Sequence, residues 1–124
     1  MAWSAIYNRE PGIIETTYIG QMSREELQEA ITATVELITA NRVYLLFGDA
    51  MKLEHDGSIF DIYEMVSVFE QFPFAHYMKE ALLIPVSKAA LADLAFYETA
   101  CKNRGLNVRL FNDKDDAIRW LCEK

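Results

Sequence analysis

Hydrophobic and polar positions along the chain recur in a pattern that predicts alternating strands and helices. Two stretches rich in β-branched and aromatic residues come first, at 3–7 and 13–20, and Pro11-Gly12 marks a turn between them. The short link predicts an antiparallel hairpin. Three further apolar runs are typical of strands buried between helix layers, at 43–47, 81–86 and 107–111.

Between and after these strands, apolar residues recur with the spacing of helices. Ser23 and Glu26 fit a capping box, in which each side chain accepts a hydrogen bond from a free backbone N–H of the first turn. Asn41 is a plausible left-handed stop for this first helix, and Pro73 should end the second helix by about Phe72. The four helices are predicted to begin near Ser23, Ser58, Ser87 and Asp113.

The resulting order is ββαβαβαβα. A hairpin followed by βαβ units predicts an α/β fold with a five-stranded mixed sheet and helices on its faces. The whole chain, 1–124, is predicted to be one domain, because its length suits a single core.

The amino-acid composition of the chain limits the functions and surroundings that we expect for it. Lys and Arg total 12 against 19 Asp and Glu, a net charge of −7, which disfavours nucleic acid as a partner. No apolar run approaches the roughly 20 residues of a membrane span. Cys101 and Cys122 lie in helix-like segments without a CxxC pattern, so we expect reduced thiols in a cytoplasmic protein.

Polar side chains gather in the segment from Gly48 to Met65. Asp49, Glu54, His55 and Asp56 lie there, but their spacing matches no calcium loop or other metal motif. The sequence contains no G-x-S-x-G and no glycine-rich phosphate loop. We therefore expect no catalytic residues, no metal and no cofactor, and a protein that is not an enzyme.

The arrangement of these stretches resembles the SpoIIAA-like family of bacterial STAS-related domains. The resemblance covers nearly the whole chain and rests on "GIIETTYIGQMSREELQEA", "LLFGDAMKLEHDGSIFDIYEM" and "NVRLFNDKDDAIRWL". It implies a STAS-like fold related to the CRAL-TRIO lipid-binding fold. It implies little about activity, because most members have none assigned.

In the anti-sigma-factor antagonists of this group, a strand ends in Asp and a loop then carries a phosphorylatable Ser before a helix. The matching positions here are Asp49 after the strand and Asp56-Gly57-Ser58-Ile59 before the helix. Ser58 and Asp61 also form an S-x-x-D helix start, so Ser58 has a capping role open to it besides a switching role.

Aromatic residues crowd into the segment from Phe60 to Tyr77. Helical spacing accounts for Phe69 as core but does not account for Phe72, Phe74 and Tyr77. Three interpretations stay open: a loop folded onto the core, a surface for a partner, or a gate over an apolar pocket. We expect the rings of Phe72 and Phe74 to point to different sides of the chain. The residues assigned to this surface are Phe60, Tyr63, Phe72, Phe74 and Tyr77.

Two hypotheses of function follow. The first is a small non-catalytic regulatory or protein-interaction domain, like the anti-sigma-factor antagonists. The second is a carrier or sensor of an apolar small molecule or lipid, held beneath the Phe60–Tyr77 segment. The expected partner is thus another protein or an apolar small molecule, and a homo-oligomer is left open.

Substitution of Ser58 separates capping from switching. Ser58→Ala should lower the free energy of unfolding by about 1 kcal/mol through the lost cap. Ser58→Asp should keep the fold, because Asp also caps helices, while weakening a phosphorylation-sensitive partner. A pull-down that recovers the same proteins with wild type and Ser58→Asp would argue for capping alone.

Overall fold

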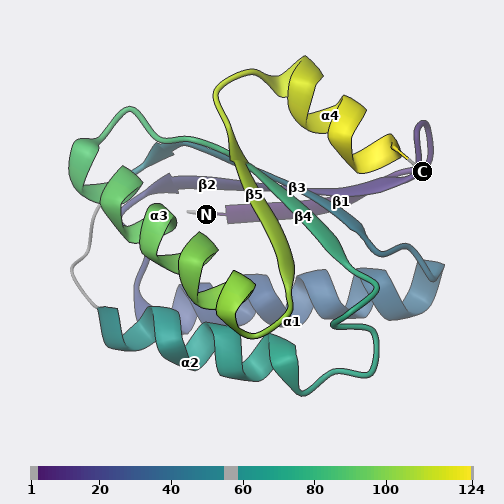
Figure 1. Ribbon diagram of the computed structural model, residues 1–124, viewed down its shortest axis with the longest axis horizontal. Coiled ribbons are helices and arrows are strands. Elements are labelled where there is room, and N and C mark those ends of the chain that lie inside the picture. The colour runs from purple at the N-terminus through teal and green to yellow at the C-terminus, as the bar shows by residue number, and fades with distance from the viewer. Residues whose placement is uncertain (1–2, 55–58, 124) are drawn as a thin grey trace.

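Within residues 3–54 and 59–123, which the computed structural model describes, five strands and four helices follow the predicted order ββαβαβαβα (Figure 1). The strands are β1 (Trp3–Asn8), β2 (Ile13–Gly20), β3 (Leu45–Leu53), β4 (Lys79–Leu83) and β5 (Asn107–Phe111). The helices are α1 (Arg24–Asn41), α2 (Ile59–Glu70), α3 (Lys88–Asn103) and α4 (Lys114–Cys122).

The strands lie in the sheet in the same order as in the sequence, β1-β2-β3-β4-β5. β1 pairs antiparallel with β2, as predicted, and the other neighbouring pairs are parallel. Each connection between consecutive parallel strands is right-handed and leads to the next strand in the same direction across the sheet. The helices in these connections therefore all lie on one face of the sheet. Figure 1 shows α1, α2 and α3 on one face and α4 alone on the other.

Side-chain caps begin the helices where the sequence predicts them. Ser23 and Glu26 form the complete capping box of α1. The side chain of Ser87 accepts from the backbone N–H of Ala90 at the start of α3, and Asp113 accepts from Asp116 at the start of α4. The helix predicted near Ser58 begins at Ile59, and Ser58 itself lies outside the described residues.

Some predicted element ends are wrong. The third strand does not end at Phe47 but continues to Leu53, so "GDAMKL" is strand and not loop. The fourth strand spans Lys79–Leu83 instead of 81–86. The left-handed residue after α1 is Arg42, with φ 53°, while Asn41 is the last helical residue.

Two apolar cores lie on the two faces of the sheet. The larger is covered by α1, α2 and α3 and includes Ile14, Leu46, Phe69 and Val108. The smaller lies under α4, where Phe47, Ala81 and Leu83 of the sheet meet Ala117 and Leu121. Alternate residues of each strand therefore serve opposite cores, as the pleat requires.

A bulge and a glycine shape the part of the sheet that faces α1, α2 and α3. The step of two residues from Thr17 to Ile19 in β2 is matched by a step of three from Asp49 to Lys52 in β3, so β3 carries an extra residue. Gly48 precedes the bulge. A Cβ atom there would lie 2.5 Å from Leu82 Cδ2 and 3.3 Å from Thr16 Oγ1. Hence the absence of a side chain at Gly48 gives room to its neighbours.

Gly48→Ala tests this close approach. We expect it to lower the free energy of unfolding by about 1–3 kcal/mol, because the methyl group overpacks a buried site. In a Leu82→Val background, which lacks the Cδ2 atom, the same substitution should have little effect. Urea unfolding of the four proteins measures the coupling, and an equal effect of Gly48→Ala in both backgrounds would contradict this packing.

Candidate functional site

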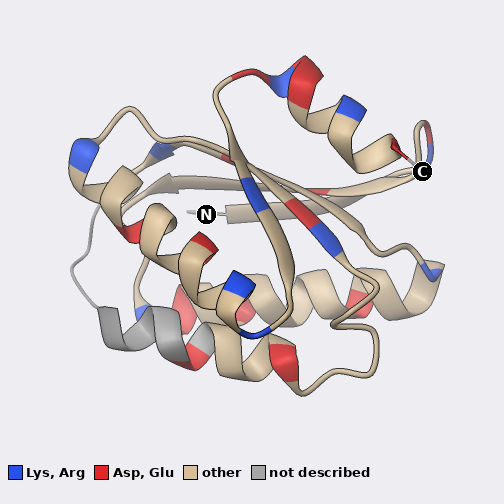
Figure 2. Ribbon diagram, in the orientation of Figure 1, with Lys and Arg blue, Asp and Glu red and all other residues tan. Residues whose placement is uncertain are grey.

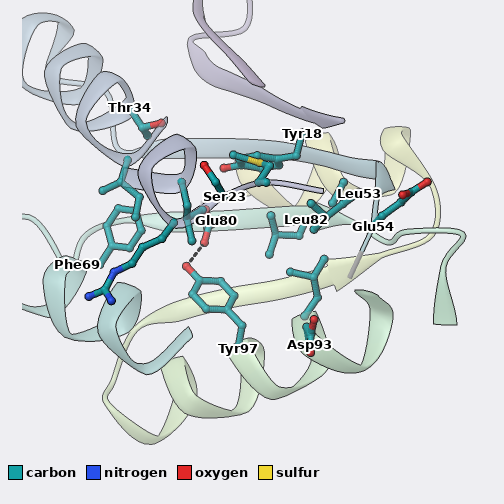
Figure 3. Close-up of a pocket in the computed structure, with 16 residues that line it drawn as sticks. Tyr18, Ser23, Thr34, Leu53, Glu54, Phe69, Glu80, Leu82, Asp93 and Tyr97 are labelled. Carbon is teal, nitrogen blue, oxygen red and sulfur yellow. Dashed lines mark hydrogen bonds between the residues drawn. The ribbon is translucent and has the colours of Figure 1, made fainter. Parts of the chain in front are cut away.

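A cavity of about 120 Å³ lies between the sheet and the three helices that cover it (Figure 3). The sheet contributes Tyr18, Ala50, Leu53, Glu80 and Leu82. The extra residue in β3 explains why both Ala50 and Leu53 line the cavity, although a regular strand would point them to opposite faces. The helices contribute four apolar side chains, Leu27, Ile31, Phe69 and Leu94, and four polar ones, Arg24, Thr34, Asp93 and Tyr97.

The cavity reaches the surface where β2 and β3 end and α1 begins. Ser23, Arg24 and Glu54 line it and are exposed. The guanidinium of Arg24 donates to both carboxylate oxygens of Glu64, at 2.6 and 2.5 Å, and so connects α1 to α2 beside the opening. Ligands of open α/β sheets commonly bind beyond the carboxyl ends of parallel strands, and this opening has that position.

A buried carboxyl group lies in the wall of this apolar cavity. Glu80 is only 6% exposed, although it lies in β4 in the middle of the sheet. The hydroxyl of Tyr97, from α3, donates to Glu80 Oε1 at 2.5 Å (Figure 3). Because an unpaired buried carboxyl is strongly destabilising, this hydrogen bond is essential to the placement of Glu80.

Burial changes the acidity of the groups around the cavity. Burial raises the pKa of Glu80 above its usual value, although the hydrogen bond from Tyr97 acts against the change. Burial and then the charge of Glu80 raise the pKa of Tyr18 to about 12 and that of Tyr97 well above its usual value. The same two causes raise the pKa of the Cys101 thiol to about 12, so this cysteine is an inert thiol at neutral pH.

The cavity has the chemistry of a small binding site. Pockets for small molecules are mostly apolar, with a few polar groups that fix orientation, and a carboxyl with a raised pKa in such a pocket marks a candidate functional site. An apolar cavity of about 150 Å³ holds a benzene ring in another protein, which sets the scale of a ligand here. The described residues thus offer space for one compact apolar group next to Glu80 and Tyr97.

Of the acidic residues singled out from the sequence, Glu54 lines the cavity at its opening, whereas Asp49 does not line it. Asp49 lies within β3, not after it, and its Oδ1 accepts from the backbone N–H of Met51 at 3.1 Å. The expected correspondence with a strand-terminal Asp is therefore wrong. Asp61 belongs to α2. Asp56 and Ser58 are outside the described residues, so the switching role of Ser58 stays a prediction.

The aromatic segment is arranged differently from what we expected. The rings of Phe72 and Phe74 do not point to different sides but stack, with centroids 5.2 Å apart and an angle of 8° between the planes. Phe74 also packs against the larger core and against Tyr44. Tyr77 is 76% exposed. Phe60 and Tyr63 lie in α2, and their side chains are outside the described part. The partner role of these five residues stays a prediction.

Among the described aromatic residues of that segment, only Phe69 lines the cavity. The described residues contain no group of three or more His, Cys, Asp or Glu side chains placed to hold a metal ion. His55 and Asp56 lie outside them. In the described part of the chain, no helix combines the length and apolar character of a membrane span.

Sequence analysis missed Glu80, Tyr97 and Tyr18. Glu80 directly precedes the apolar run that we assigned as a strand, so it looked like the end of a loop. Tyr97 lies on the buried side of α3, and nothing in the sequence pairs it with Glu80. The one available signal was the alternation of Glu80 with Leu82 on a strand extended by two residues.

Glu80→Gln tests the burial of the carboxyl through the pH dependence of stability. The raised pKa in the fold means that the unfolded chain loses this proton first as the pH rises. The wild type should therefore match Glu80→Gln near pH 4 and then lose stability relative to it, by up to about 1.4 kcal/mol per pH unit, between the unfolded and folded pKa values of Glu80.

Urea unfolding from pH 4 to pH 8 measures this difference. Glu98→Gln is a matched control, because the carboxylate of Glu98, on α3, also bonds within the fold but is half-buried and accepts from the backbone N–H of Leu110. A wild type that gains stability relative to Glu80→Gln as the pH rises would contradict the assignment.

The chain is similar in fold to a solved structure. No protein-family model matches the chain, and no curated protein does either. A solved structure of an uncharacterised protein of the DUF3478 family from Shewanella loihica PV-4, described as having a SpoIIAA-like fold, superimposes with a TM-score of 0.64. It is 20% identical, and the match covers 98% of this chain and 93% of that one. With the five-stranded mixed sheet and the order ββαβαβαβα, this shows that the chain has a SpoIIAA-like fold.

Proposed function

We propose that this domain is a non-catalytic regulatory module of the cytoplasm that senses a compact apolar molecule bound in the cavity under α1, α2 and α3. The observation that carries the proposal is the cavity itself, in which apolar side chains lie around the buried, hydrogen-bonded pair of Glu80 and Tyr97. The SpoIIAA-like fold is compatible with it but does not select a ligand.

The form of the cavity favours binding over catalysis. Two other polar residues around it have structural roles: Ser23 caps α1, and Thr34 Oγ1 donates to the carbonyl of Ala30. Catalysis by acid and base requires two groups placed on either side of a reacting atom. Here Glu80 and Tyr97 bond to each other, which suits recognition of one polar end of a ligand.

A second function, protein interaction, is supported by a different observation. Ile19, Met51 and Val86 are exposed by 47%, 45% and 80% at the ends of β2 and β3 and in the loop after β4. They lie near one another, since Val86 N–H donates to the carbonyl of Met51 and Ile19 pairs with Lys52. Exposed apolar residues of this kind suit a partner that would receive the signal.

Native mass spectrometry of the gently purified protein tests the proposed function. We expect a bound small-molecule mass on the wild type. Ala50→Leu should lose that mass, because residue 50 is buried and lines the cavity, and Leu94→Phe fills the same space from α3. Ala89→Leu is the matched control, since Ala89 is exposed on α3 and should keep the ligand.

Two results would contradict the proposal. A small-molecule mass that persists in folded Ala50→Leu and Leu94→Phe would place the ligand elsewhere. A wild type that carries only a bound protein would favour the interaction function instead.

A further inference from the structure

We infer that the cavity binds a compact apolar amine, whose ammonium group lies against Glu80 and the hydroxyl of Tyr97. This inference rests on the proposed function and adds the chemical class of the ligand. It is carried by the position of Glu80 in the cavity wall and by the charges that surround the opening.

Residue 80 is a glutamate, although a glutamine would also fit this position. A glutamine there could also accept the hydrogen bond from Tyr97, with nearly the same shape and without a group that can ionise in the core. Burying a carboxyl group that can ionise is destabilising unless a partner compensates it. A neutral ligand would gain little from a carboxyl over an amide, whereas a cationic ligand gains an opposite charge.

Glu80 and Tyr97 together have unused hydrogen-bond acceptor positions. The Tyr97 hydroxyl donates a hydrogen bond to Glu80 Oε1, and its other side-chain partner is Cys101. A hydroxyl oxygen has two acceptor lone pairs, so it can still accept. An ionised Glu80 likewise has only acceptor positions. The pair then presents acceptors to the cavity, and an ammonium group supplies three donors.

The charges around the cavity favour the entry of a cation. Glu54, Asp93 and Glu80 line the cavity against one guanidinium, that of Arg24, which is paired with Glu64. Figure 2 shows acidic residues along α1 as well, whose exposed side carries Glu25, Glu29 and Glu36. Together with the net charge of −7, these groups attract small cations and repel anionic amphiphiles such as fatty acids.

The remaining titratable neighbours of Glu80 do not supply the missing positive charge. Tyr18 and Cys101 have raised pKa values, so both are neutral near pH 7. An ammonium ion would restore the ionised form of Glu80, which burial alone disfavours. The rings of Phe69, Tyr18 and Tyr97, all lining the cavity, suit the apolar part of the ligand and can also face a cation.

Four probes of one ring size test the inference by isothermal titration calorimetry at pH 7: benzylamine, benzyl alcohol, toluene and benzoate. Benzylamine should bind the wild type about tenfold or more tightly than benzyl alcohol, the ratio expected for a hydrogen-bonded charge, and benzoate should bind most weakly. In Glu80→Gln this ratio should fall to about one while toluene binding is unchanged. Asp115→Asn, which removes an exposed carboxyl of α4 on the other face of the sheet, should keep the ratio.

A second measurement needs no variant. In the wild-type complex, NMR should show nuclear Overhauser contacts between the methylene group of benzylamine and the side chains of Glu80 and Tyr97. Contacts of that methylene group with Glu54 or Asp93 instead would overturn the inference.

The outcomes separate this inference from the proposed function. Binding of toluene and benzyl alcohol without an amine preference, or an amine preference that persists in Glu80→Gln, overturns the amine assignment and leaves an apolar binding site. Failure of all four probes to bind overturns both.

Discussion

The handedness of the β-strand crossovers determines where every other feature of the protein lies. Four parallel strands advance across the sheet in one direction, so right-handed crossovers place α1, α2 and α3 on the same face (Figure 1). Three helices meeting one twisted face leave more space to fill than α4 does on the other. The small residues Gly48 and Ala50 lie on the face that the three helices cover, and Ala50 lines the cavity there.

Among the described residues, Glu80 is the only acidic or basic one that is buried. Its neighbours in the sheet on the same face are Leu46 and Val108, both buried, as a central parallel strand requires. A carboxyl at this position opposes folding through its desolvation, and the bond from Tyr97 offsets only part of that effect. Local rules of strand composition are broken at functional sites more often than elsewhere, which is why we place the site here.

The sequence predicted what depends on local chemistry and missed what depends on tertiary contact. The caps at Ser23, Ser87 and Asp113 and the order of elements follow from short-range patterns, and they were found. The continuation of β3 through Gly48 and Asp49 was missed, because both residues usually end a strand and here neighbouring strands hold them. The stacking of Phe72 on Phe74 and the pairing of Glu80 with Tyr97 join residues by three-dimensional position alone.

The bulge in β3 lies between the cavity and the exposed apolar residues on which the two proposed functions rest. On one side of this short segment, Ala50 and Leu53 line the cavity. Between them, Met51 is exposed, and its carbonyl holds the backbone of Val86. In a sensor, ligand binding must change the segment that the partner contacts. This is possible where the ligand and the partner contact the same segment, or where one segment with two conformations reaches both sites. Because a bulge leaves one residue outside the regular ladder, this segment is less constrained by the sheet than the strands around it. A change in the packing of Leu53 therefore affects the same short segment of β3 that carries the exposed side chain of Met51.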